Sequence, residues 1–170
     1  HARYPDHRIV AVDLDGGQLH AGTVLAEGHD FFSSPRLSPD GRHLAWLAWD
    51  HPRMPWQGTT LFMAELDADG RPACAPIAVA GGSDEAVLQP EWSPLGTELW
   101  FISDRSGWWN LYRYKLANGH VDAITSLDAE FGQPQWTLGR STYAFTGPAR
   151  VVATYSRNGL AKLALVEAGT

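Results

Sequence analysis

The chain has 170 residues, of which 44% are hydrophobic and 19% charged, and it carries a net charge of −6. This length suffices for one sizeable core or for several small sheets that share one. The acidic balance argues against a surface that follows nucleic-acid phosphates, and no apolar run is long enough to span a membrane. We therefore expect neither a nucleic-acid partner nor a membrane partner.

Cysteine usage and the first residues bear on the cellular compartment. Cys74 is the only cysteine, so an intrachain disulfide is excluded. Residues 1–6 are polar and interrupted by a proline, unlike a signal peptide. A cytoplasmic location is the expectation that follows.

The start of the chain predicts two strands joined by a turn. Residues 8–14 are rich in aliphatic side chains, and an Asp-Gly-Gly turn follows at residues 15–17. We interpret residues 1–33 as the end of a preceding sheet whose beginning is missing.

Three similar segments then follow one another along the chain. They are PRLSPDGRHLAW, PEWSPLGTELWF and PQWTLGRSTYAF, which start at positions 35, 90 and 134 and hence lie 55 and 44 residues apart. Propeller blades repeat at about 40–50 residues. The longer first interval contains an unusual loop, DHPRMPW at residues 50–56, so the irregular spacing has a local cause.

Each repeat predicts a strand, a tight turn and a second strand. In the turn at Ser38-Pro39-Asp40-Gly41, proline presets φ at the second position and glycine relieves the strained last one. Residues 110–116 alternate between apolar and polar side chains, and Asn118-Gly119 predicts a hairpin into a fourth strand. No stretch has sustained helical periodicity. Repeated four-stranded antiparallel units indicate a β-propeller.

The predicted fold is therefore all-β, a partial β-propeller of about three four-stranded antiparallel blades with WD40-like repeats. We assign residues 34–88 to a complete blade with a loop insertion at 50–59, residues 89–132 to a second complete blade, and residues 133–170 to a further blade, either complete or incomplete. The strand order of this last blade stays open, because residues 145–148 can be a turn or a blade boundary. Three blades are fewer than the four to eight of a closed propeller, so we expect a piece of a larger one.

Two loop motifs accompany the repeats: WDHPRMPW at residues 49–56 and SDRSGWWNLY at residues 103–112. Combined with the repeats, they resemble the prolyl oligopeptidase-type serine peptidases, in the acylaminoacyl-peptidase and dipeptidyl-aminopeptidase branch. The resemblance covers most of residues 33–145. Gln57 departs from it, because an acid is expected there.

The resemblance implies a propeller that covers a C-terminal α/β-hydrolase domain with a Ser-Asp-His triad and restricts access to short peptides or aminoacyl amides. The 170 residues contain no Gly-x-Ser-x-Gly nucleophile motif. We therefore expect no catalytic residue and no cofactor in this chain. The expected partners are the hydrolase domain, the remaining blades and a short peptide or aminoacyl-amide substrate.

The unusual side chains are expected on one rim of the blades. Because strands alternate in direction, the loops at 50–59 and 103–110 share a rim with the inter-blade loops at 81–87 and 126–132. Aromatic side chains there can contact apolar substrate groups, and an acid or arginine can hold a peptide terminus. The candidate substrate-binding residues are Asp50, His51, Trp56, Arg105, Trp108 and Trp109.

A purely structural role is the alternative for each of these residues. Asp50 can cap its own loop, Trp56 can pack on a neighbouring blade, and Arg105 can form a salt bridge between blades. Trp108 and Trp109 cannot both point inward, because adjacent strand residues face opposite sides.

Other functions fit the sequence less well. The seven histidines form no His-x₃-His pattern and the single cysteine has no partner, so a metal site is not expected. Glycosidases that use a pair of carboxylates also occur on propellers, but the candidate aspartates lie in turns, where capping of the backbone explains their presence. The main alternative is a non-catalytic protein-binding propeller resembling the Tol-system translocation protein, which shares the Ser-Pro-Asp-Gly repeat.

Overall fold

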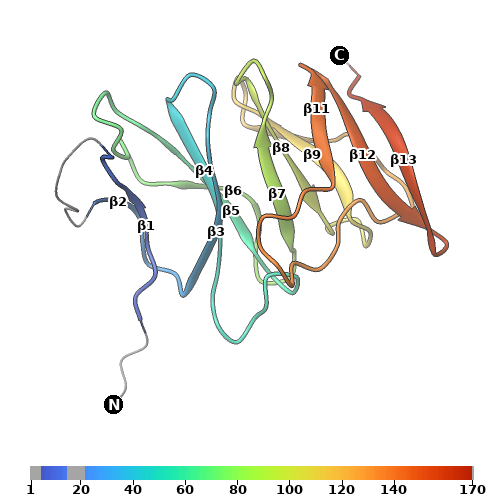
Figure 1. The fold of residues 1–170 in the computed structure, drawn as a ribbon, viewed down its shortest axis with the longest axis horizontal. Helices are drawn as coiled ribbons and strands as arrows, with labels where there is room; N and C mark the ends of the chain where they lie inside the picture. The colour runs from blue at the N-terminus through green and yellow to red at the C-terminus, as the bar shows by residue number, and fades with distance from the viewer. Residues whose placement is uncertain (1–4, 15–21, 170) are drawn as a thin grey trace.

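The structure, a computed structural model, describes residues 5–14 and 22–169. Within these residues the chain forms thirteen β-strands and no helix, and hence no helix that could cross a membrane. The turn predicted at residues 15–17 lies outside the described residues. Figure 1 shows the sheets following one another across the molecule, from the blue N-terminal strands to the red C-terminal ones.

Two four-stranded antiparallel sheets form the middle of the chain. In each, consecutive strands are neighbours, so the chain runs up and down through the sheet. The first sheet contains β3 (Phe31–Leu37), β4 (His43–Trp49), β5 (Thr60–Glu65) and β6 (Ile77–Gly81). The second contains β7 (Val87–Trp92), β8 (Glu98–Ser103), β9 (Asn110–Lys115) and β10 (His120–Ala123). The predicted all-β fold with four-stranded antiparallel sheets is confirmed.

Smaller sheets flank these two. Before them, β1 (Ile9–Ala11) pairs with β2 (Thr23–Ala26). After them comes a third sheet of β11 (Tyr143–Gly147), β12 (Arg150–Arg157) and β13 (Leu160–Glu167). Residues 145–148, whose role the sequence left open, form the end of β11 and its turn into β12.

The third repeat differs from the other two at its first strand. In the alignment of the repeats, β11 corresponds to β4 and β8, and residues 134–136 correspond to the ends of β3 and β7. Residues 134–136 form no strand. The third sheet has three strands because its first strand, not its last, is missing from the ladder.

A β-bulge at a proline marks the first strand of both four-stranded sheets. The strand register shifts just before Arg36 in β3 and just before Glu91 in β7. The residue before each proline has a positive φ, 52° at Ser34 and 45° at Gln89. Proline cannot donate a ladder hydrogen bond, so a bulge accommodates it in the strand. The first two repeats are therefore similar in backbone conformation as well as in sequence.

The Ser-Pro turns between the first and second strands are built alike. In the first, the Ser38 hydroxyl donates to the Asp40 carboxylate at 2.6 Å and accepts from the His43 N–H at 2.9 Å. In the second, Ser93 accepts from the Glu98 N–H at 3.2 Å. The last turn residue has φ 72° at Gly41, a left-handed conformation that favours glycine. These contacts explain the Ser and Gly positions of the predicted turns.

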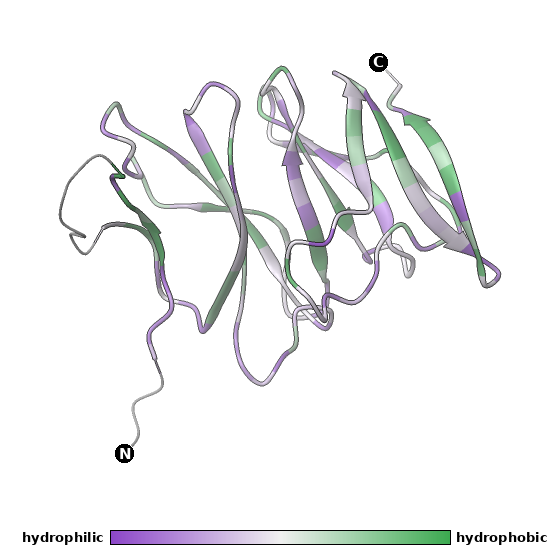
Figure 2. Cartoon of the chain, viewed as in Figure 1, coloured by the Kyte–Doolittle hydropathy of each residue, from purple (hydrophilic) through white to green (hydrophobic). Residues whose placement is uncertain are grey.

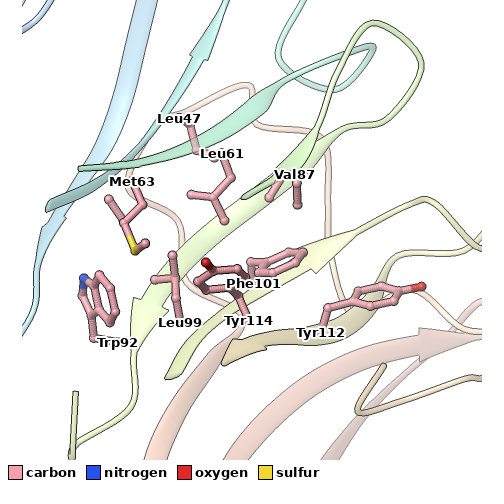
Figure 3. Close-up of a cluster of buried hydrophobic side chains, with 11 residues drawn as sticks. Leu47, Leu61, Met63, Val87, Trp92, Leu99, Phe101, Tyr112 and Tyr114 are labelled. Carbon is pink, nitrogen blue, oxygen red and sulfur yellow. The ribbon is translucent and has the colours of Figure 1, made fainter. Parts of the chain in front are cut away.

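Hydrophobic clusters fill the space between successive sheets. Figure 3 shows the cluster between the two four-stranded sheets, where side chains of β4 and β5 meet those of β7, β8 and β9. A second cluster joins the second sheet to the third, and a further one joins β1 and β2 to the first sheet. β4 supplies alternate residues to two clusters, with Leu47 on one side and Trp46 on the other. Burial on both faces explains its near-continuous apolar sequence.

The last strand leaves apolar side chains in solvent. Figure 2 shows β13 as largely hydrophobic. Val166 packs on the second cluster, whereas Leu163 and Leu165, on the opposite face, are well exposed. Among the described residues, no further sheet covers that face.

Candidate functional site: a rim of three loops

Three loops meet at one rim of the sheets: residues 50–59, 82–86 and 103–110. The Thr59 N–H donates to the Glu85 carbonyl at 3.1 Å, which joins the insertion loop to the connection between the sheets. On the other side of that connection, the Ala86 N–H donates to the Asp104 carboxylate at 2.8 Å. The middle loop thus links the two loops that carry the candidate residues, and the rim expected from strand alternation is formed.

Asp50 ties the insertion loop to the chain that precedes β3. Its carboxylate accepts hydrogen bonds from the Asp30 N–H at 2.8 Å and from Nδ1 of His29 at 2.9 Å. In return, the His51 N–H donates to the Asp30 carboxylate at 2.9 Å. Asp50 is a cap, but it caps residues 29–30 rather than its own loop. The His51 ring has no hydrogen bond or ion pair with any described residue.

These contacts set the charge state of Asp50. Burial raises the pKa of the Asp50 carboxyl, but the Asp30 N–H and the His29 ring prevail and hold the pKa below its ordinary value of 3.8. A carboxylate whose pKa is lowered by folding adds stability above its unfolded-state pKa. That contribution is lost as the pH falls through the folded-state pKa.

Replacing Asp50 with asparagine is expected to produce a pH-dependent loss of stability. Above about pH 5 the variant is less stable than the native protein by up to about 1 kcal/mol, because this pair is partly exposed. The difference shrinks below pH 3.8 and disappears as the pH falls through the lower folded-state pKa of Asp50, where the native carboxyl becomes neutral like the amide. Urea midpoints at several pH values measure it. Asp69→Asn, at an exposed turn position, is the control, and an Asp50→Asn difference that persists unchanged at low pH would contradict the expectation.

Trp56 contacts a residue that the sequence did not single out. Its ring lies 4.2 Å, centroid to centroid, from that of Trp136. Trp136 belongs to the connection that leads to β11, so the contact joins the first sheet's loop to the third repeat rather than to the neighbouring blade. Trp56 is half-buried, but Trp136 remains 75% exposed. The pair therefore presents an apolar surface at the rim.

The exposure of Trp136 could not be predicted from the repeat pattern. It aligns with Trp92, which is only 7% exposed and donates its indole N–H to the Arg36 carbonyl at 2.9 Å. Trp136 lacks this environment because the third repeat has no regular first strand. One signal in the sequence was available: the Ser-Pro turn after Trp92 is replaced by Thr137-Leu138-Gly139 after Trp136.

Arg105 forms a salt bridge, as expected if its role is structural. Its Nη2 and Nε lie 2.7 and 2.9 Å from one carboxylate oxygen of Glu85, in the connection between the two four-stranded sheets. The guanidinium also lies over the ring of Tyr112, at 5.1 Å from its centroid. These contacts favour a positioning role for Arg105, which holds the β8–β9 loop against the connection.

Trp108 and Trp109 face opposite sides, as expected of adjacent residues. The Trp109 ring packs against the second hydrophobic cluster, and the backbone N–H of Trp109 donates to the Glu130 carboxylate at 3.0 Å. A Cβ added at Gly132 would lie 3.0 Å from the Trp109 ring, so glycine is needed for this close contact. Trp108 is exposed. Of the two, Trp108 is thus the one available at the surface.

The six candidate residues do not converge on one point. No hydrogen bond, ion pair or ring contact joins any two of them. The described residues also contain no group of three or more His, Cys, Asp and Glu side chains that could hold a metal ion. What the rim presents is an apolar surface with charged groups that are held in place by partners in the chain.

Comparison with known proteins shows which proteins the chain resembles. The chain is 40% identical to the crystal structure of puromycin hydrolase, with a TM-score of 0.77, over 88% of this chain and 24% of that one. It is 35% identical to a puromycin-hydrolyzing peptidase of Mycobacterium tuberculosis, with a TM-score of 0.80, over 95% of this chain and 28% of that one. The chain is a propeller-like segment homologous to these prolyl oligopeptidase-family proteins.

Further relatives agree with this assignment. The propeller segment is 24% identical over 162 residues to dipeptidyl-peptidase 5 of Porphyromonas gingivalis, covering 94% of this chain and 23% of that protein. The segment thus spans about a quarter of the length of these relatives. No protein-family model matches it. TolB from Acinetobacter baumannii shares the fold, with a TM-score of 0.60 at 19% identity.

Proposed function

We propose that this chain is the substrate-selecting part of the propeller of a serine peptidase that acts on short peptides or aminoacyl amides. Its 40% identity to puromycin hydrolase and 35% identity to a puromycin-hydrolyzing peptidase support the substrate class. The 170 residues contain no Gly-x-Ser-x-Gly motif. Bond cleavage therefore belongs to a hydrolase domain elsewhere in the whole protein.

The observation that carries the selecting role is the Trp56–Trp136 pair. Two indole rings meet at the rim where the insertion loop lies, and one of them is largely open to solvent. Large aromatic faces bind apolar and aromatic side chains through buried area and ring stacking. Asp50 and Arg105 act in this proposal as positioning residues, since both are held by partners in the chain. Trp108 adds a second exposed aromatic surface.

Replacing Trp56 with alanine is the direct test, made in the intact protein that carries this segment. We expect kcat/KM for substrates with a bulky apolar side chain to fall about tenfold relative to small ones, the usual worth of a hydrophobic contact of this size. A series of chromogenic aminoacyl amides measures the ratio. Leu95→Ala, at an exposed turn on the opposite rim, is the control. Lower stability with an unchanged substrate preference would count against the selecting role.

The alternative, a protein-binding propeller of the Tol type, rests on fold likeness alone. Labelling the intact protein with a serine-reactive phosphonate separates the two functions. A peptidase is labelled at its nucleophile, whereas a protein-binding propeller is not.

A further inference from the structure

A small cavity lies between the second sheet and the third, where the third repeat lacks its first strand. Its volume is about 230 Å³. Residues of β7 and β8, the connection at 132–142 and Thr154 of β12 line it. None of the six rim candidates contributes to it. Unlike the larger cavities of about 450 and 460 Å³, it is lined by no residue from before β3.

One wall of the cavity carries an arginine without a carboxylate partner. Arg140 makes no ion pair with any described residue, and its Nη1 donates a hydrogen bond to the side-chain oxygen Oε1 of Gln133 at 3.3 Å. A guanidinium has five N–H donors and binds carboxylates through paired hydrogen bonds. Arg140 is exposed, so most of its donors remain available to an anionic group that enters the cavity.

A second wall carries a buried acceptor without a donor. Gln135 is only 9% exposed, and its side-chain oxygen has no hydrogen-bond partner. Leaving such a group unpaired costs about 1–3 kcal/mol, so it favours any ligand that brings an N–H. Its counterparts in the other repeats, Arg36 and Glu91, satisfy each other in an ion pair at 3.1 Å. Gln135 alone of the three has an unpaired buried atom.

We propose that this cavity binds an α-amino carboxylate, a group in which an N–H and a carboxylate sit on the same carbon. The carboxylate pairs with Arg140, and the N–H donates to the Gln135 oxygen. The volume is below the about 300–1,000 Å³ of pockets for drug-sized ligands, so the occupant is of single-residue size. A free amino acid and the C-terminal residue of a short peptide both present this chemistry. The binding site does not depend on the selecting role of the rim.

The test is equilibrium binding of four small probes to the intact protein, followed by saturation-transfer NMR. Alanine and glycylglycine each carry both groups, whereas acetate lacks the N–H and alaninamide lacks the carboxylate. We expect Arg140→Gln to weaken binding of a two-group probe at least about tenfold, the worth of a charge-assisted hydrogen bond. Binding of glycylglycine without alanine identifies a peptide end, and binding of both identifies the free amino acid as a ligand too.

Variants separate this cavity from any other site for the same probes. Arg157→Gln removes an exposed arginine at the β12–β13 turn, outside the cavity, and is expected to leave binding unchanged. Gln135→Leu is expected to abolish the preference for alanine over acetate. Because Arg140 is exposed, its replacement does not threaten the fold. Equal binding by the native and Arg140→Gln proteins, or equal binding of acetate and alanine by the native protein, would overturn the proposal.

Discussion

Replacing Leu99 with alanine is expected to lower the free energy of unfolding by about 2–5 kcal/mol. Leu99 lies in β8 with no exposed surface and packs in the cluster between the two four-stranded sheets (Figure 3). The cluster is formed by side chains of two rigid sheets, so the space left by the missing methyl groups cannot easily close. Both the lost burial of apolar surface and the remaining cavity then lower the free energy of unfolding.

Leu95→Ala provides the matched control for this variant. Leu95 lies four residues earlier, in the Ser-Pro turn, and is 67% exposed. Its replacement is expected to change the free energy of unfolding by no more than about 0.5 kcal/mol. Urea denaturation of the intact protein, followed by tryptophan fluorescence, measures both. Similar losses for the two variants would show that the sheets do not pack as described.

Gln89→Leu is expected to lower the free energy of unfolding by about 2–4 kcal/mol, because it removes buried hydrogen bonds that join the second sheet to the third. Gln89 is buried, and its amide donates to the Tyr143 carbonyl at 2.7 Å and accepts from the Thr142 N–H at 2.7 Å. Leucine is close in size but leaves both backbone groups without their partner. The effect therefore reports hydrogen bonding rather than lost volume.

The same substitution at a surface glutamine shows whether the loss comes from buried hydrogen bonds or from the change of side chain itself. Gln57 is exposed, and its side-chain oxygen accepts from the Met54 N–H at 2.9 Å. Gln57→Leu is expected to cost less than about 1 kcal/mol, since water replaces the lost bond. Hydrogen exchange adds a local measurement: Gln89→Leu is expected to raise the exchange rate of the Thr142 amide. Unchanged exchange there would mean that the Gln89 side chain does not hold this end of the third sheet.

Local sequence determined the parts of the fold that could be predicted. The Ser-Pro turns at residues 38–41 and 93–96 need only their own side chains, so their strands could be placed from the sequence. The second strand that each repeat predicts after its turn is β4 in the first repeat and β8 in the second. The shared rim followed from strand alternation alone.

Long-range contacts explain what the sequence did not predict. Asp50 lies against residues 29–30, and no pattern in the insertion loop indicates that partner. Trp136 aligns with a buried tryptophan, and its exposure results from a strand that fails to form in the third repeat. The Gln89 tie was also missed, because its positive φ and its four bonds across to Ser141, Thr142 and Tyr143 are properties of the assembled sheets.

The ion pair between Arg36 and Glu91 has a consequence for the order of the blades. These residues occupy the same position in successive repeats, and the next repeat places the neutral Gln135 there. Each repeat therefore carries a different charge at one shared position: positive, negative, then none. Exchanging the second and third repeats would set Arg36 beside Gln135 and separate it from Glu91. Although the repeats are similar in sequence, they are not interchangeable, because the charges at this position favour one order of the repeats along the chain.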